Sequence, residues 1–284
     1  MEIKANMVKD LREKTGAGMM DCKKALGETG GDMEQAVEWL RKKGLSKAAK
    51  RAERATKAGY IGACLAPGGK KAAFVELSCE TDFVAKNDDF RKMAQQLAEH
   101  VNKTGVVDVE KLAGEKFTAD PSKTVGDLLA EAIAKIGESI KIGQALVWQV
   151  EKPENALAWY IHTNNTAVGV SELAGVAGKD VAELGKNLGM QIVASRPQYL
   201  VPADVPAEVI AKEKEIYRAE AAAAGKPEAM IDKIADGKLG KFYQDVCLIK
   251  QLYVRDPQGK MTVEQLLKEA GVGVARFARL SVGS

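Results

Sequence analysis

The sequence predicts an α+β fold in which a three-helix bundle precedes two copies of a small unit, each with its own antiparallel sheet. Three observations support this prediction. Short β-rich runs flank turn residues twice, over residues 60–77 and 160–173, as in β-hairpins. Helix-period apolar stripes and a later strand follow both hairpins in the same order, which indicates a duplicated unit. Ala, Lys and Glu are abundant while aromatic residues make up only 5%, which favours helices elsewhere.

The first 44 residues predict a compact domain of three short helices. The first helix has an apolar edge around Leu11, and Thr15-Gly16-Ala17-Gly18 breaks it, because glycine permits a tight turn. A second helix begins near Met19, and Gly30-Gly31-Asp32 ends it and caps a third. We expect the third helix to end before Gly44, since glycine commonly follows a helix C-terminus.

Residues 45–58 predict a basic linker helix. The stretch from Arg41 to Lys57 holds eight basic residues against Glu53 alone, while the whole chain has a net charge of only +3. Such a stretch can contact phosphates, so RNA contact is one interpretation. It lacks interleaved aromatic residues for base stacking, and a solvated linker helix is the interpretation that we favour. No direct nucleic-acid binding is expected.

Residues 59–152 predict the first copy of the core unit. Its hairpin turns at Pro67-Gly68-Gly69, and its main helix starts at Asn87 or Asp88. That helix carries an unbroken i, i+3, i+4, i+7 stripe, formed by Phe90, Met93, Ala94, Leu97, Ala98 and Val101. Another helix is predicted after Thr124, before a strand over residues 139–150.

Residues 153–197 and 245–284 predict the second copy. Its hairpin turns at Asn164-Asn165, and its main helix has a stripe from Val181 to Ile192. Thr262 precedes the next helix, which leads to a strand over residues 273–282. The two copies thus match in the order of their elements.

Residues 198–244 interrupt the second copy and predict an antiparallel helical hairpin. Helices over 207–223 and 228–243 are joined through Gly225 and Pro227, a combination typical of one helix ending and the next beginning. Apolar pairs at seven-residue spacing predict the seam of a short coiled coil. These pairs are Val209/Ile210, Ile216/Tyr217 and Ala223/Ala224, facing Ile231, Ile234 and Phe242.

Composition argues against several classes of function. The four cysteines form no Cys-x-x-Cys pair and no signal peptide is recognisable, so we expect reduced thiols and a cytoplasmic location. No run of about 18 apolar residues occurs, so no membrane partner is expected. His100 and His162 are the only histidines, too few for a histidine-rich metal site. We expect neither a bound metal nor a cofactor.

No arrangement of residues predicts an enzyme. Nucleophilic catalysis needs Ser or Cys beside a histidine, and His100 is expected to flank the apolar stripe of its helix. Thr15-Gly16-Ala17-Gly18 lacks the Lys-Ser/Thr of a phosphate-binding loop and follows no strand. Asp88-Asp89 is explained by the start of a helix. The chain is therefore interpreted as a non-enzymatic binding protein.

A short loop, Thr81-Asp82-Phe83-Val84-Ala85-Lys86, places an aromatic ring beside a carboxylate, between the first hairpin and its helix. Phe83 lies outside the stripe that starts at Phe90, so the helix does not need it to complete its buried face. An apolar side chain on such a loop is either buried under the local fold or presented to a partner, and burial is the more common outcome. The loop residues by themselves leave both outcomes open.

Two motifs resemble one protein family. Residues 81–84 and residues 11–26, LREKTGAGMMDCKKAL, closely resemble bacterial translation elongation factor Ts, in the same order and at the expected separation. That family is the guanine-nucleotide exchange factor for elongation factor Tu, and the resemblance extends over nearly the whole chain. It implies that residues 1–44 form a bundle of the ubiquitin-associated (UBA-like) type and that residues 198–244 form an antiparallel coiled-coil protrusion.

The resemblance also implies site residues. In the family, the aspartate and phenylalanine of the Thr-Asp-Phe-Val motif reach the partner's nucleotide-binding domain and disturb the region that holds Mg²⁺ and the β-phosphate. The residues that match this motif are Thr81, Asp82, Phe83 and Val84, and on this basis we expect Phe83 to be presented. A second contact with the same partner domain is implied for Lys9, Arg12, Met19 and Met20, and a contact with another partner domain for His162.

Several of these expectations have alternatives. Met19 and Met20 are adjacent and cannot both face one helix core, so at least one should be exposed, although a purely core role stays open. His162 could equally be an ordinary strand histidine. Family members often continue past the last strand into a helix that docks on the partner. This chain ends at Gly283-Ser284, so we expect it to lack that contact.

Two other functions stay open at this point. A ribosome- or RNA-binding module would use the basic stretch from Arg41 to Lys57. A nucleotide-independent adaptor or chaperone would rely on the helical hairpin of residues 198–244.

Overall fold

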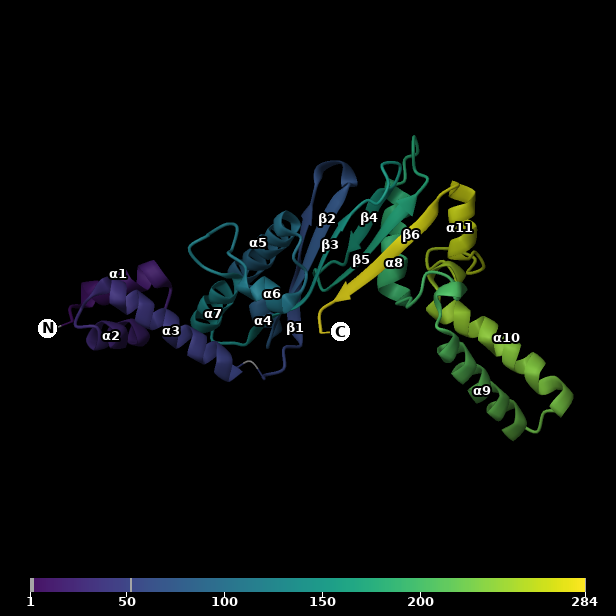
Figure 1. Ribbon diagram of the computed structural model, residues 1–284, viewed down its shortest axis with the longest axis horizontal. Coiled ribbons are helices and arrows are strands. Elements are labelled where there is room, and N and C mark those ends of the chain that lie inside the picture. Colours follow the sequence, from purple (N-terminus) through teal and green to yellow (C-terminus); the bar gives the residue numbers. More distant parts are fainter. Residues whose placement is uncertain (1–2, 52, 284) are drawn as a thin grey trace.

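Two three-stranded antiparallel sheets form the centre of the molecule, and the other elements are arranged around them (Figure 1). This computed structural model describes residues 3–51 and 53–283, apart from the side chains at positions 45, 47, 49, 50 and 67. The first sheet has the order β1-β2-β3 and the second β4-β5-β6. The strands are β1 Ala58–Leu65, β2 Lys71–Cys79, β3 Ile140–Gln149, β4 Ala156–Ile161, β5 Ala167–Ala174 and β6 Gly273–Ser281.

The helices cover the outer faces of the sheets and extend the molecule at both ends (Figure 1). Helices α1 to α3 form the N-terminal unit, α9 and α10 form a projecting hairpin, and the C-terminus lies beside the sheets. The helices are α1 Ala5–Thr15, α2 Met19–Glu28, α3 Met33–Arg51, α4 Asp82–Ala85, α5 Asp88–Thr104, α6 Val109–Gly114, α7 Val125–Ile136, α8 Ala182–Ser195, α9 Ala207–Ala223, α10 Glu228–Val246 and α11 Val263–Ala270. The α+β fold class predicted from the sequence is confirmed.

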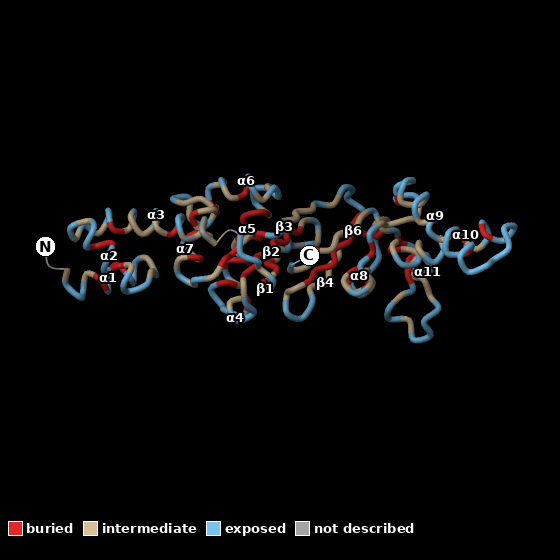
Figure 2. Tube along the Cα trace, turned by 90° about the horizontal axis from the view of Figure 1, so that it is seen from below, coloured by how far each residue is buried: buried red, intermediate tan, exposed pale blue. Residues whose placement is uncertain are grey.

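The two sheets pack face to face through one apolar layer. Phe74 of the middle strand β2 and Val170 of the middle strand β5 are fully buried in it, together with Ile61 and Leu280. The opposite faces of the sheets are covered by α5 and α8 respectively, each over a separate core cluster. Both middle strands are therefore buried on both faces. Figure 2 shows much of the buried chain in the middle of the molecule, around the sheets.

Glycines let each helix approach its sheet closely. A Cβ atom at Gly62 in β1 would lie 2.0 Å from the carbonyl oxygen of Ala94 in α5, and one at Gly169 in β5 would lie 2.3 Å from that of Gly189 in α8. No real Cβ atom tolerates such a distance, so any larger residue would push the helix away from the sheet. Both copies of the core unit thus have a strand glycine that lets the long helix pack closely on the sheet.

The duplication predicted from the sequence is confirmed element by element. In each copy a β-hairpin precedes a long helix, and a shorter helix leads into the third strand. The shorter helices α7 and α11 begin with the same capping box, in which Thr124 pairs with Asp127 and Thr262 pairs with Gln265. This arrangement satisfies two backbone N–H groups that the helix itself leaves unpaired.

Buried glutamates at equivalent places in the two middle strands connect the units. Glu172 in β5 accepts hydrogen bonds from the Asn155 side chain (2.7 Å) and the Glu151 N–H (2.8 Å), and it pairs with Arg276 (2.8 Å). Arg276 also lies 4.4 Å from the ring centroid of Trp148 in the first sheet. Burial would raise the pKa of Glu172, but these hydrogen bonds outweigh it and lower the pKa.

The opposite end of the sheet pair has its own polar junction. Glu76 in β2 accepts a hydrogen bond from the N–H of Gly283 (3.0 Å), which fixes the end of the chain on the first sheet. Asn165, in the β4–β5 turn, has a left-handed backbone with φ of 52°. Its carbonyl oxygen accepts from the Ile61 N–H (2.7 Å) and its side chain donates to the Ile61 oxygen (3.2 Å). The turn is thereby attached to β1.

The third helix differs from the prediction. It was expected to end before Gly44, with a separate linker helix after it, but α3 continues to Arg51 without a break. Gly44 lies against α7, where an added Cβ would be 3.5 Å from the Ala130 oxygen. That distance is an ordinary van der Waals contact, so the packing of α3 on α7 does not require glycine at this position. The contact with α7 continues the helix past Gly44, and α3 links the N-terminal unit to the core as one rod (Figure 1).

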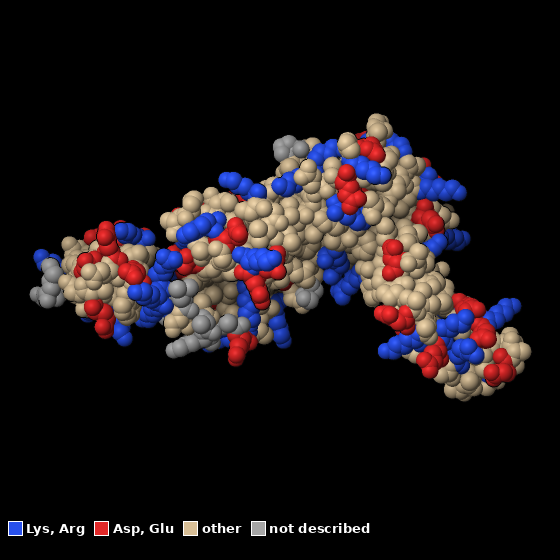
Figure 3. Space-filling model, in the orientation of Figure 1, with Lys and Arg blue, Asp and Glu red and all other residues tan. Residues whose placement is uncertain are grey.

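Much of the positive charge of the basic stretch is neutralised within the chain. Arg41 forms a two-pronged pair with the buried Asp127 of α7, at 3.1 and 2.5 Å. The other pairs are Lys42 with Glu38, Lys43 with Asp21 and Arg54 with Glu80. The side chains of Lys47 and Lys50, also in this stretch, lie outside the described residues. Figure 3 shows red and blue atoms together where the N-terminal unit meets the core.

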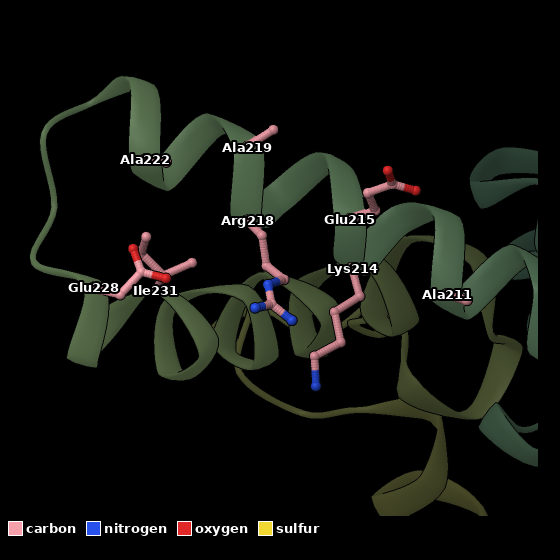
Figure 4. A pocket seen from close by; sticks show the side chains of 8 residues that line it. All are labelled: Ala211, Lys214, Glu215, Arg218, Ala219, Ala222, Glu228 and Ile231. Carbon is pink, nitrogen blue, oxygen red and sulfur yellow. The ribbon is translucent and has the colours of Figure 1, made fainter.

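The inserted hairpin has the predicted helices but a different seam. Ala221, Ile231 and Ala235 are buried between α9 and α10, whereas Ile216 and Ala223 are exposed. The predicted seven-residue pairs were therefore partly wrong, because the buried side of α9 steps through Tyr217 and Ala221, four residues apart. A pocket of about 560 Å³ lies along this seam. Figure 4 shows Lys214 and Arg218 directed from α9 toward α10, where they pair with Asp236 and Asp232.

His100 on α5 is fully buried, not at the flank of the stripe as expected. Its Nδ1 accepts a hydrogen bond from the N–H of Thr118 (3.2 Å), and its ring lies 5.8 Å from that of Phe117. Nε2 has no hydrogen-bond partner among the described residues. Burial lowers the pKa of His100 below its ordinary value. The folded state therefore holds the neutral imidazole, because a charged ring would place two donors in the core.

We expect the free energy of unfolding to fall as the pH drops below about 6.5, the ordinary pKa of histidine. The unfolded chain takes up the proton first, so the contribution of His100 is fully present above that pH and is lost toward the lower folded-state pKa. Urea unfolding at pH 7.5, 6.5 and 5.5 measures this dependence. His100→Gln should flatten it, while His162→Gln, at an exposed site, should not. Equal slopes in the native protein and His100→Gln would contradict the assignment.

Candidate partner-binding site

The segment predicted as a loop at residues 81–86 contains a single helical turn, α4. Thr81 caps it, and its side chain accepts from the N–H of Val84 (3.5 Å). Glu138 holds this cap in place, because its carboxylate accepts from the Thr81 N–H (3.0 Å) and from the Thr81 hydroxyl (2.7 Å). Glu80, the residue before Thr81, in turn accepts a hydrogen bond from the N–H of Ser139, the residue after Glu138 (2.7 Å). Four hydrogen bonds thus fix the start of the turn.

Phe83 projects from this turn into solvent. Its side chain is 82% exposed, the largest exposure among the large apolar residues of the described chain. Its neighbours face inward: Ala85 is buried and Val84 packs against the core of the first unit. Burial of the ring, the more common outcome for an aromatic residue, does not occur here. The turn therefore presents one large apolar group on a fixed backbone.

Asp82 lies next to this ring on the same turn. Lys86, one helical turn later, pairs with it at 2.8 Å, and both side chains are largely exposed. The hydrogen bond from Lys86 lowers the pKa of Asp82 below its ordinary value. The carboxylate is therefore negative at neutral pH, and it can exchange its exposed lysine for another partner with little cost.

The N-terminal unit presents a second exposed surface. Met19 and Met20 are 49% and 73% exposed, so both are accessible where at least one was expected. Lys9 and Arg12 are exposed on α1, and Lys9 pairs weakly with Glu13 at 3.8 Å. The flexible thioether side chains of methionine suit an adaptable contact. This surface lies at the far end of the molecule from the hairpin (Figure 1).

His162 lies exposed at the start of the β4–β5 turn. Its Nδ1 is 3.2 Å from the hydroxyl of Tyr160, and the two rings meet edge to face. The same turn is attached to β1 through Asn165. The structure thereby brings the second unit's turn close to α4, since Asp82 and Asn164 line one groove. Lys9, Arg12, Met19 and Met20 are not part of this cluster.

Some residues that shape this surface were not found by sequence reasoning. Lys86 could have been found, because it follows Asp82 at the i, i+4 spacing of a helical ion pair. Glu138 could not, since it is 57 residues from Thr81 and its position between a helix and a strand has no distinctive pattern. Arg91 was also missed, although its Nε donates to the Ala85 oxygen (3.2 Å) and supports the end of the turn.

Other classes of site find little support in the structure. The described residues contain no group of three or more His, Cys, Asp or Glu side chains able to hold a metal ion. None of the helices in the described part of the chain is long and apolar enough to cross a membrane. All four cysteines are free thiols, and burial raises the pKa of the Cys79 thiol to about 12. Such a thiol is a poor nucleophile.

Removing the carboxylate that holds Thr81 should loosen the turn without unfolding the protein. Glu138→Ala deletes two hydrogen bonds, together worth roughly 1–3 kcal/mol, so amide exchange of residues 81–86 should quicken by about tenfold or more. Hydrogen–deuterium exchange measures this, and the melting temperature checks the fold. Glu138→Gln retains one acceptor and should show an intermediate effect. Unchanged exchange in Glu138→Ala would show that Glu138 does not hold the turn.

Comparisons with known proteins agree on one family. Residues 80–284 match the family described as Elongation factor TS. Elongation factor Ts of Methylococcus capsulatus is 46% identical over 283 residues, which cover 100% of this chain and 93% of that protein. The proteins of the same name from Trichlorobacter lovleyi and Aquifex aeolicus are 43% and 42% identical over 295 and 291 residues, covering 100% of this chain and 93% and 99% of theirs. The chain therefore belongs to the elongation factor Ts family of translation elongation factors.

Proposed function

We propose that this protein is a guanine-nucleotide exchange factor that binds GDP-bound elongation factor Tu and promotes the release of GDP. The observation that carries the proposal is the exposed ring of Phe83 on a turn held by Glu138. A large apolar side chain that is 82% exposed contributes little to the fold of its own chain, and it needs a partner to be of use. Family membership supports the choice of partner.

The proposed step involves no covalent chemistry, so the protein is not an enzyme in this proposal. In GTP-binding partners the diphosphate is held by Mg²⁺ and a set of backbone N–H groups. Insertion of the Phe83 ring into an adjoining apolar cleft would displace those groups. Asp82 would compete for the groups that orient the water ligands of the ion.

The fixed backbone of α4 matters for this mechanism. A ring on a mobile loop would lose conformational freedom on binding, and that loss would reduce the free energy available to displace GDP. Thr81 and Val84 serve the ring by holding the turn against the core. Coupling is reciprocal, so the factor by which this protein lowers the affinity for GDP equals the factor by which GDP lowers the affinity for this protein.

The other exposed surfaces would add contacts to the same partner. In the proposal Lys9, Arg12, Met19 and Met20 touch the nucleotide-binding domain, and His162 touches another domain. The rod-like α3 and its Arg41–Asp127 pair support this role, because they hold the N-terminal surface at a fixed distance from Phe83. Two contacts on a rigid frame bind more tightly than either does by itself.

Two rival functions have less support. An RNA-binding module would use the basic stretch, but Arg41, Lys42, Lys43 and Arg54 are paired with acidic side chains. Its affinity for RNA would fall steeply with added salt. An adaptor based on the helices α9 and α10 would bind its clients equally well whatever nucleotide elongation factor Tu carries. Nucleotide release from purified elongation factor Tu, with and without this chain, separates both from the proposed function.

Phe83→Ala should slow stimulated GDP release by roughly 30-fold or more, because a central aromatic contact is commonly worth 2 kcal/mol or more. The fold should be unaffected, since truncating an exposed side chain usually changes stability by less than about 0.5 kcal/mol. Stopped-flow fluorescence of GDP release at a saturating concentration of the variant measures the effect.

Leu65→Ala is the matched control for Phe83→Ala. Leu65 is also an exposed apolar residue, but it lies at the other end of β1, since Leu65 pairs with Ala72 while Ala58 pairs with Cys79 near α4. Its truncation should leave GDP release unchanged. Native-like release by Phe83→Ala would remove the ring from the mechanism.

A further inference from the structure

A groove of about 380 Å³ opens beside the turn that carries Phe83. One wall is formed by Asp82 of α4 and by Lys86, directly after this helix. The other wall is formed by Asn164 in the β4–β5 turn and by Val282, directly after β6. Lys57, just before β1, and Arg91 on α5 complete it. The groove thus lies where the two core units meet, next to the proposed site.

The groove has an excess of positive charge. It contains three cations and one carboxylate, Asp82, which is paired with Lys86 at 2.8 Å. Neither Lys57 nor Arg91 forms an ion pair with a carboxylate of the described residues. This differs from Arg41, Lys42 and Lys43 at the start of the basic stretch, which each have an acidic partner. Two cations here are left without a counter-charge.

Arg91 is held in position for binding. Its Nε donates to the Ala85 oxygen (3.2 Å), and its guanidinium lies 5.5 Å from the ring centroid of Tyr60. Because these contacts fix the side chain, its terminal N–H groups can bind a carboxylate with little loss of side-chain freedom. Lys57 is exposed and has no such contacts in the described structure.

The opposite wall is held as firmly as α4. The N–H of Val282 donates to the Thr166 oxygen (2.9 Å), and Asn165 makes two hydrogen bonds with Ile61. The groove is therefore present before any partner binds. Its shape depends on both core units, so it would be absent if the two sheets did not face each other.

We propose that this groove binds an acidic segment of elongation factor Tu that lies next to the cleft entered by Phe83. The proposal rests on the proposed function, which brings the partner's surface over α4. Lys57 and Arg91 would pair with carboxylates of that segment, and charge complementarity is what selects it. The groove would chiefly speed association, because charges near the rim of an interface act on the rate of encounter. Phe83 would then act on the nucleotide.

The test measures association and GDP release separately, with Lys57→Glu, Arg91→Gln and the double variant. The double variant should bind GDP-bound elongation factor Tu about tenfold more slowly at low salt, and each single variant about threefold more slowly. The difference from the native protein should shrink as the salt concentration approaches 1 M, where the screening length is about 3 Å. In Lys57→Glu, which leaves the hydrogen bond from Arg91 to the Ala85 oxygen intact, the maximal rate of GDP release at saturating factor should stay at the native value.

Lys152→Glu is the matched control, because it makes the same change of charge as Lys57→Glu at another exposed lysine. Lys152 follows β3, at the end of the first sheet where Gln149 pairs with Lys71, and the groove is at the end where Ile140 pairs with Cys79. The control should associate at nearly the native rate. Equal slowing by Lys152→Glu and Lys57→Glu would overturn the proposal in favour of a general effect of net charge.

The remaining outcomes separate the groove from the exchange function. If the native protein does not stimulate GDP release, the proposed function fails and the groove proposal fails with it. If the native protein stimulates release and the double variant associates at the native rate at every salt concentration, only the groove proposal fails. Slower maximal release with native association in Lys57→Glu would also overturn it, since the groove would then act on the nucleotide phosphates. Melting temperatures check that Arg91→Gln retains the fold.

Discussion

The apolar layer between the two sheets is the constraint on which the rest of the structure depends. Phe74 and Val170 lie on the inner faces of the middle strands, and α5 and α8 cover the outer faces. Each sheet therefore has one apolar core on its inner face and another on its outer face. Neither unit can shift along the other without exposing Ile61 or Leu280, so the two halves of the duplication act as one body.

This packing decides which surface features lie together. Phe83 follows β2, whereas His162 and Asn164 belong to the β4–β5 turn of the second unit. The turn α4 and the β4–β5 turn line one groove, through Asp82 and Asn164. They are held there because Asn165 exchanges two hydrogen bonds with Ile61 of β1, and because Glu76 of β2 binds the chain end. The hydrogen bonds at the edges of the sheets thus hold parts of both units side by side, and together these parts form one surface at one end of the sheet pair.

Exposure and rigidity are combined at α4 in a way that helps binding. An exposed phenylalanine makes a protein more prone to association, and in the described part of the chain Phe83 is the one phenylalanine that is exposed. Glu138, Glu80 and Arg91 hold the backbone of that turn through hydrogen bonds from other elements. The N-terminal unit is likewise fixed, since Arg41 pairs with the buried Asp127 and Gly44 packs on α7. Contacts at both places can therefore be made with little ordering of the chain.

Local signals in the sequence determined most of the elements of this protein. Turn residues, caps such as Asn87 and Thr124, and apolar stripes depend on neighbours within about four residues, so they could be read directly. The tertiary structure decided what those signals leave open. Gly44 sits inside a helix because α3 packs along α7 there, and Ile216 turns outward because the facing helix α10 sets the seam. Whether Phe83 is buried or exposed depends on Glu138, which contacts the Phe83 turn only after folding. Which basic residues have an acidic partner likewise depends on distant residues, such as the Asp127 that pairs with Arg41. Contacts between residues far apart in the chain have no local pattern, and for that reason only the folded molecule decides them.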